Sequence, residues 1–159
     1  MLKTGEYVMY SWYGACKVDG VKEEVLDSIS KQYYILKPVN DEKATVMIPI
    51  SNVQVRPVLS KEEAIGLLDS VNEVSVDWID NSRLRNTRYL QILKDKDSRQ
   101  LLAMLRLLLK KREELTDSGR KFSMQDTQIL ELTSNYLISE LTVALDMERD
   151  ELEEKLMAE

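Results

Sequence analysis

The chain has 159 residues, of which 43% are hydrophobic and 31% charged, and its net charge at neutral pH is −6. This composition is typical of a folded protein and excludes an intrinsically disordered one. Histidine is absent, which excludes imidazole catalysis and His-rich metal sites. The single cysteine, Cys16, excludes an internal disulfide framework and a cysteine-built zinc site.

The sequence also lacks the motifs of cofactor-binding and membrane proteins. Its five glycines are scattered and match neither the P-loop nor the dinucleotide-binding spacing. The longest apolar stretch, residues 101–109, contains Arg106 and is far shorter than the roughly 20 residues of a membrane span. The first residues do not resemble a signal peptide. We therefore expect a cytoplasmic protein that is not an enzyme, binds no metal, cofactor or small-molecule ligand and does not enter a membrane.

The first 58 residues favour β-structure. Runs of β-branched and aromatic residues predict five short strands, at residues 8–12, 16–21, 32–36, 45–50 and 53–58. Turn-forming residues separate them, for example Asp27-Ser28 and Val39-Asn40-Asp41. Five short strands in so few residues predict a small SH3-like or Tudor-like β-barrel.

The fourth predicted strand alternates between apolar and exposed positions. Its apolar side chains share one face, and Thr45 and Met47 face the other way, toward solvent or a partner. Pro49 cannot donate a hydrogen bond to a ladder, so this strand is expected at an edge of the sheet or to end there.

From Ser60 the apolar period becomes helical. Ser60-Lys61-Glu62-Glu63 is a capping box that opens a first helix. We expect a second helix capped by Asp77 or Asp80 and ending near residue 93, and a leucine-rich third capped by Asp97 or Ser98. A fourth follows the cap Ser123, and a short acidic fifth covers about residues 148–156. The predicted class is α+β, with a barrel at 1–58 and an all-helical domain of about five helices at 59–159.

Charge is distributed unevenly along the helical half. Residues 78–122 contain twelve Lys or Arg against six Asp or Glu, whereas residues 123–159 contain two against ten. A basic block between acidic ones is a candidate nucleic-acid surface. The same pattern also fits an ordinary solvated helix face, so charge alone leaves both interpretations open.

Several segments together resemble one family of proteins, the CarD/CdnL/transcription-repair coupling factor group. The segments are, in chain order, Gly5-Glu6-Tyr7-Val8-Met9-Tyr10, Tyr33-Tyr34-Ile35-Leu36, Ile48-Pro49-Ile50-Ser51-Asn52, Arg56-Pro57-Val58, Trp78 with the arginines after it, and Phe122-Ser123. Their order and spacing are similar to those of CarD/CdnL proteins. We expect the stand-alone type, because a chain of this length is too short to hold the motor domains of a coupling factor.

The resemblance implies a transcription regulator that binds RNA polymerase. The barrel would dock on the polymerase β subunit, and the helical domain would touch promoter DNA at the upstream edge of the melted bubble, weakly and without reading sequence. A tryptophan in that domain would wedge into the minor groove. The alternative is a protein–protein adaptor that has no DNA contact, in which the acidic fourth and fifth helices recruit a partner.

The DNA-contact residues expected on this basis lie in the basic block. They are Trp78, Arg83, Arg85, Arg88, Lys94, Lys96, Arg99, Arg120 and Lys121. If Trp78 starts a continuous helix, Arg85 returns to its face because seven residues make about two turns. A tryptophan can equally anchor a core between helices, so Trp78 is either the exposed wedge or such an anchor.

The polymerase-contact residues are expected around the fourth strand. An exposed edge can add a strand to a partner's sheet, with backbone hydrogen bonds for affinity and outward side chains for specificity. The candidates are Lys43, Thr45 and Met47, with Glu24 on the neighbouring strand. Relatives often carry arginine at the positions of Glu24 and Met47, so the electrostatic part of the contact is expected to differ. Met47 also fits an ordinary surface methionine.

Overall fold

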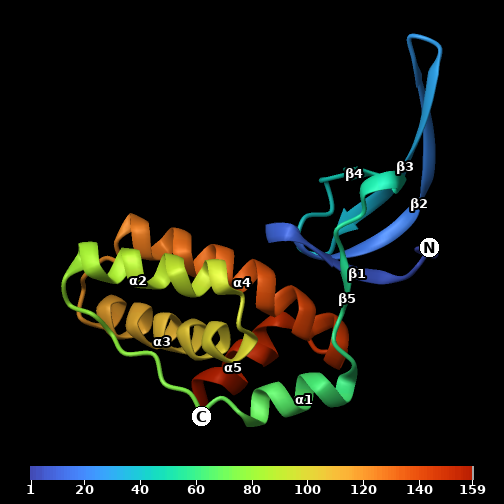
Figure 1. Cartoon of the computed structure of the whole chain (residues 1–159). Coiled ribbons are helices and arrows are strands. Elements are labelled where there is room, and N and C mark those ends of the chain that lie inside the picture. The colour runs from blue at the N-terminus through green and yellow to red at the C-terminus, as the bar shows by residue number, and fades with distance from the viewer. Residues whose placement is uncertain (159) are drawn as a thin grey trace. The chain divides into compact units, whose positions relative to one another are not determined.

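The computed structural model describes residues 1–158, which form two compact units (Figure 1). The sheet unit, Met1–Val58, contains the strands, and the helical unit, Leu59–Glu159, contains the α-helices. The predicted α+β class, with strands first and five helices after them, is confirmed. None of the helices within residues 1–158 is both long and apolar enough to cross a membrane.

The sheet unit is a five-stranded antiparallel sheet. Its strands are β1 (Tyr7–Tyr10), β2 (Gly14–Leu26), β3 (Ile29–Pro38), β4 (Val46–Pro49) and β5 (Arg56–Pro57). Their order in the sheet is β4-β3-β2-β1-β5, which leaves β4 and β5 as the two edges. Short 3-10 turns follow β1 and β4, at Ser11–Tyr13 and Ile50–Asn52.

One face of this sheet forms a small apolar core. The buried members are Val8, Cys16, Val18, Tyr34, Leu36 and Ile48. In β3 and β4 they alternate with more exposed residues, because successive side chains of a strand point to opposite faces. Burial raises the pKa of the Cys16 thiol from 9.0 to about 11, so Cys16 is a core residue rather than a reactive one.

The outer parts of β2 and β3 form a two-stranded hairpin beyond the rest of the sheet (Figure 1). β1 pairs with β2 only over Gly14–Lys17, and β4 pairs with β3 only over Tyr33–Leu36. All residues from 21 to 32 are exposed. The tip is a tight turn in which Asp27 and Ser28 both have positive φ, as a type I′ hairpin requires. Both strands are therefore longer than the sequence predicted.

The helical unit contains α1 (Lys61–Asp69), α2 (Ser82–Asp95), α3 (Ser98–Asp117), α4 (Met124–Leu145) and α5 (Arg149–Ala158). The predicted capping box at Ser60 is present, and Asp97 and Ser123 cap their helices as expected. The predicted cap of the second helix is wrong. Asn81, rather than Asp77 or Asp80, caps α2 because its side-chain oxygen accepts from the Leu84 amide at 3.0 Å.

Leucine-rich faces of α3 and α4 make the core of this unit. α4 packs against each of the other four helices. The fully buried side chains include Ile92, Leu101, Leu105, Leu108, Leu137, Ile138 and Leu141. Glu140 of α4 is also fully buried, and its carboxylate accepts a hydrogen bond from the Leu59 amide at 3.0 Å, which fixes the chain just before α1.

The state of Cys16 gives a direct test of the sheet core. At pH 8 a thiol with a pKa of about 11 is ionised to only ~0.1%, so native Cys16 should react with Ellman's reagent at least ~100-fold more slowly than cysteine in urea-unfolded chain. Because its folded-state pKa is raised, the stabilising contribution of Cys16 should be present below pH ~9 and lost toward pH 11. Rapid labelling of the native chain would contradict this core.

Candidate functional site

Strand β4 presents an accessible edge in the sheet unit. It is a terminal strand of the ladder, and the exposed fraction of its Met47 is 37%. Lys43 and Thr45, just before it, are exposed as well, and the Thr45 hydroxyl pairs with the ammonium of Lys37 on β3. The structure thus brings Lys43, Thr45 and Met47 together along one edge.

Glu24 does not belong to this group. It lies on β2, and the strand next to β4 is β3, where Ile35 is opposite Met47. Glu24 pairs in register with Lys31 in the protruding hairpin and forms an exposed ion pair with Lys22 at 3.3 Å. The expectation that Glu24 neighbours the fourth strand is wrong, because β3 lies between β2 and β4 in the sheet.

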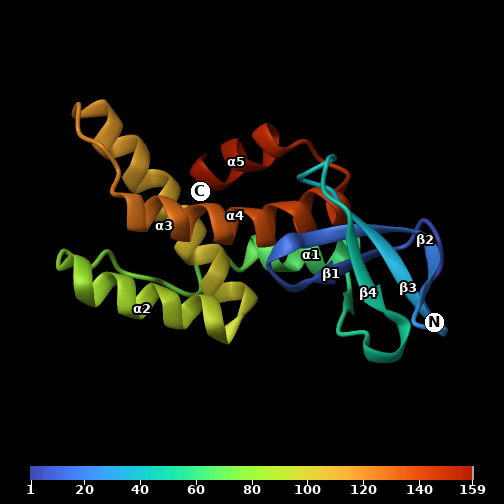
Figure 2. The same ribbon diagram turned by 90° about the horizontal axis from the view of Figure 1, so that it is seen from above.

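The predicted basic residues separate along α2. Figures 1 and 2 show α2 and α4 beginning at the same end of the helical unit. We call this the basic end, because it carries the exposed residues Arg83, Arg88, Arg120 and Lys121. The fourteen residues of α2 span about 21 Å, so Lys94, Lys96 and Arg99 lie far away at its other end.

Two cations of the far group are already engaged. Arg99 forms an ion pair with Glu73 at 3.5 Å, and the Lys96 ammonium lies 5.6 Å from the centre of the Tyr136 ring. Arg83 and Arg88 form no ion pair with any residue in the range 1–158. The basic end is therefore the better supported anion-binding surface of the two.

Trp78 lies in the segment between α1 and α2, four residues before α2 starts, and is half-buried. The expectation that it begins a helix is wrong. Two cations lie against its ring, with the Arg85 guanidinium carbon 4.2 Å and the Lys111 ammonium 5.0 Å from the ring centre. The Tyr89 ring also contacts it, at 6.5 Å between centroids. The indole is thus packed on α2 and α3 instead of projecting freely.

Arg85 is buried, whereas its expected role as a phosphate ligand calls for an exposed side chain. Its guanidinium makes a two-pronged ion pair with the Asp126 carboxylate of α4, at 2.9 and 2.8 Å, and the exposed fraction of its side chain is 8%. The same group donates to the backbone carbonyls of Ile79 and Asp80 at 2.7 and 3.2 Å. Its guanidinium is engaged within the protein, so Arg85 is less well placed to bind a phosphate than the exposed Arg83 and Arg88.

Tyr89 also holds the segment before α2 in place. Its hydroxyl donates to the Asp77 carbonyl at 2.8 Å, and burial raises the pKa of the phenol above its usual 10.0. No sequence pattern predicted a role for Tyr89 or Asp126. Asp126 is the third residue of α4 and receives a hydrogen bond from the capping Ser123, so in the sequence it reads as part of an ordinary helix start.

A groove runs beside the start of α2. It has a volume of about 640 Å³, and we call it the α2 groove. It is lined by Ser75, Val76, Asp77, Ile79, Leu84, Thr87, Arg88 and Gln91. Leu84 is the most prominent apolar group, with 61% of its surface exposed. Thr87, Arg88 and Gln91 follow Leu84 at three, four and seven residues, so they share its helix face.

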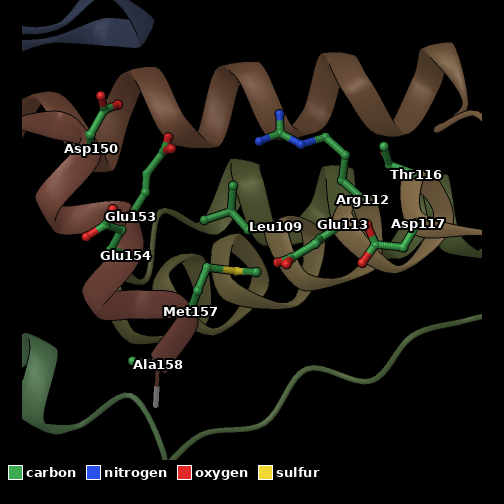
Figure 3. A pocket seen from close by; sticks show the side chains of 10 residues that line it. All are labelled: Leu109, Arg112, Glu113, Thr116, Asp117, Asp150, Glu153, Glu154, Met157 and Ala158. Atoms are coloured by element: carbon green, nitrogen blue, oxygen red, sulfur yellow. The ribbon is translucent and has the colours of Figure 1, made fainter.

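A second hollow, of about 770 Å³, lies between α3 and α5 (Figure 3). Leu109 and Met157 are among its apolar contacts, and Arg112 extends across it from α3 (Figure 3). The remaining charged residues that line it are acidic: Glu113, Asp117, Asp150, Glu153 and Glu154. This cleft repels nucleic acid, and among residues 1–158 no group of three or more acidic or cysteine side chains is arranged to hold a metal ion.

The sheet unit thus has an open edge at β4, and the helical unit has a basic end. Residues 2–61 match the family model of the CarD-like/TRCF RID domain. The family resemblance expected from the sequence is therefore confirmed over residues 2–61, and domains of this type are non-catalytic and interact with RNA polymerase. No curated protein matches the chain.

The buried ion pair can be tested by removing one partner. Asp126→Ala leaves the Arg85 charge buried without its carboxylate, so the free energy of unfolding should fall by about 3–5 kcal/mol in urea titrations. Glu131→Ala, which removes an exposed acid from the same helix, should change it by no more than about 0.5 kcal/mol. Equal effects of the two substitutions would contradict the role of the pair.

Proposed function

We propose that this protein is a stand-alone transcription regulator of the CarD/CdnL type. Its sheet unit docks on the β subunit of RNA polymerase, and its helical unit contacts DNA at the upstream edge of the promoter bubble and changes the lifetime of the open complex. The observation that carries the proposal is the RNA polymerase-interacting domain at residues 2–61, followed by a helical unit with a basic end.

Strand addition at β4 is the docking mode that the geometry supports best. The free edge of β4 can hydrogen-bond to a partner strand without rearrangement of the sheet. Met47 supplies an adaptable apolar side chain at this edge, and Lys43 and Thr45 supply polar contacts. Such a contact relies on backbone hydrogen bonds and apolar area more than on charge.

DNA contact by the helical unit requires the tether to polymerase. The whole chain is acidic, and a few phosphate contacts typically give a Kd of only about 10⁻⁴ to 10⁻⁶ M. Once the sheet unit is docked, the local DNA concentration reaches roughly the millimolar range, so a weak surface is sufficient. The protein therefore acts where polymerase has already chosen the promoter.

The docking surface is tested by Met47→Asp in the full chain. A buried charge at the centre of the strand contact should reduce co-purification with RNA polymerase by about tenfold or more. Met124→Asp, an equally drastic change at an exposed methionine of α4, should leave co-purification unchanged. Unaltered binding of the Met47 variant would reject β4 as the docking edge.

The salt dependence of DNA binding tests the basic end. If Arg83, Arg88, Arg120 and Lys121 all contact phosphates, the slope of log K against log salt for duplex DNA should be about −3.6, since each contact contributes about −0.9. Arg83→Ala should reduce the slope by about one contact, while Arg99→Ala, at the far end of α2, should not. A flat salt response would exclude phosphate contact.

The acidic cleft between α3 and α5 favours a second candidate function, that of an adaptor without DNA contact. Its five carboxylates suit a basic protein segment rather than nucleic acid. An adaptor would keep both its polymerase binding and its effect on the open complex when the charges of the basic end are neutralised. Open-complex lifetime, measured with Arg83→Ala/Arg88→Ala and with Asp150→Asn/Glu153→Gln, separates the two functions, because each predicts a defect in only one double variant.

A further inference from the structure

We propose that Leu84, and not Trp78, is the side chain that enters the DNA at the edge of the bubble, and that the α2 groove is the site that receives an unstacked base there. This inference rests on the proposed promoter function and assigns its contact site. The two side chains lie in different environments: Trp78 packs against two cations, whereas Leu84 is 61% exposed.

Trp78 is held too firmly to act as a wedge. Arg85 and Lys111 cover its ring from α2 and α3, and the following backbone is fixed by the Arg85 bonds to Ile79 and Asp80. Insertion between base pairs would break these contacts and disturb Arg85 within its buried pair with Asp126. Trp78 is an anchor that fixes one wall of the α2 groove.

Leu84 has the opposite properties. It lies in the first turn of α2, a regular helix with a hydrogen-bonded cap, so its backbone is rigid while its side chain is exposed. Aliphatic side chains such as leucine serve as wedges between base steps in minor-groove proteins. Unstacking costs least at a fork, where one neighbour of the terminal base pair is already melted.

The groove beside Leu84 has the chemistry to receive a displaced base. Val76 and Ile79 form an apolar wall, while the Thr87 hydroxyl and the Arg88 guanidinium provide hydrogen-bond donors on the helix side. Base edges and sugar oxygens in the minor groove present acceptors to such donors. Arg83, next to Leu84, is free to contact the adjoining phosphate.

Charge selects nucleic acid as the occupant. Arg88 lines the groove, the exposed Arg83 directly precedes Leu84, and Asp77 is the one acidic residue among those that line the groove. Gln91 is already engaged, since its amide donates to Asp95 at 2.8 Å. Asp77 opposes DNA binding, so its neutralisation should strengthen binding to a nucleic acid and weaken binding to a basic protein segment.

The experiment uses the full chain with a promoter open complex that carries 2-aminopurine at the upstream fork. The wild-type chain should raise the fluorescence of the probe by unstacking it. At saturating protein, Leu84→Ala should lower the ratio of unstacked to stacked probe about tenfold, as expected for loss of most of a buried leucine contact. Leu90→Ala, on another face of α2 and 40% exposed, should behave as wild type, and Leu84→Met should restore the effect.

Further readouts separate the wedge from a general loss of binding. Leu84→Ala should keep the polymerase co-purification and the salt slope of the wild type, because docking and phosphate contacts are intact. Asp77→Asn should strengthen the fork effect. If Leu84→Ala matches wild type at the fork, if Leu90→Ala is equally defective, or if Asp77→Asn weakens the effect, the inference is overturned while the promoter function stands. If the wild-type chain changes neither probe nor lifetime, both are overturned.

Discussion

The ion pair between Arg85 and Asp126 is the interaction on which the surface of the helical unit depends. One guanidinium joins α2 to α4, binds two carbonyls of the preceding segment and lies against the Trp78 ring. A buried pair contributes little net stability against an apolar replacement, but either partner alone is costly. Its value here is positional: it fixes residues 77–80 beside α2, and with them the wall of the α2 groove. The groove would not persist if this segment moved.

The net charge of the chain conceals this arrangement. Acidic residues gather on α5 and around the cleft between α3 and α5, whereas the unpaired arginines and lysine gather where α2 and α4 begin. Exposed charges more than about 8 Å apart are largely screened at physiological salt, so acidic residues on distant parts of the chain have little effect on a small basic surface. A protein with charge −6 can therefore present a small anion-binding surface, provided that another contact brings the DNA to it.

Local signals in the sequence predicted the fold well. The capping residues Ser60, Asp97 and Ser123, and the alternation through Met47, depend only on near neighbours, and the structure confirms them. The protruding hairpin was underestimated because its exposed strands lack the apolar alternation by which strands are recognised. The partnership of Arg85 with Asp126, 41 residues away, left no periodic trace, so a buried arginine was taken for a surface one. Trp78 was ambiguous for the same reason.

Because the sheet unit docks and the helical unit acts on DNA, variants of the two units should differ in their effects. A defect at the β4 edge lowers the fraction of polymerase that has this protein bound, so a higher concentration of the protein overcomes the defect. A defect at Leu84 leaves occupancy unchanged, because the tether holds the helical unit at the DNA whether or not the wedge is present. Such a variant reaches saturation with a reduced effect on the open complex, and excess protein does not restore it. Binding and action are thus separable in this chain because the residues that dock and the residues that act lie in different units.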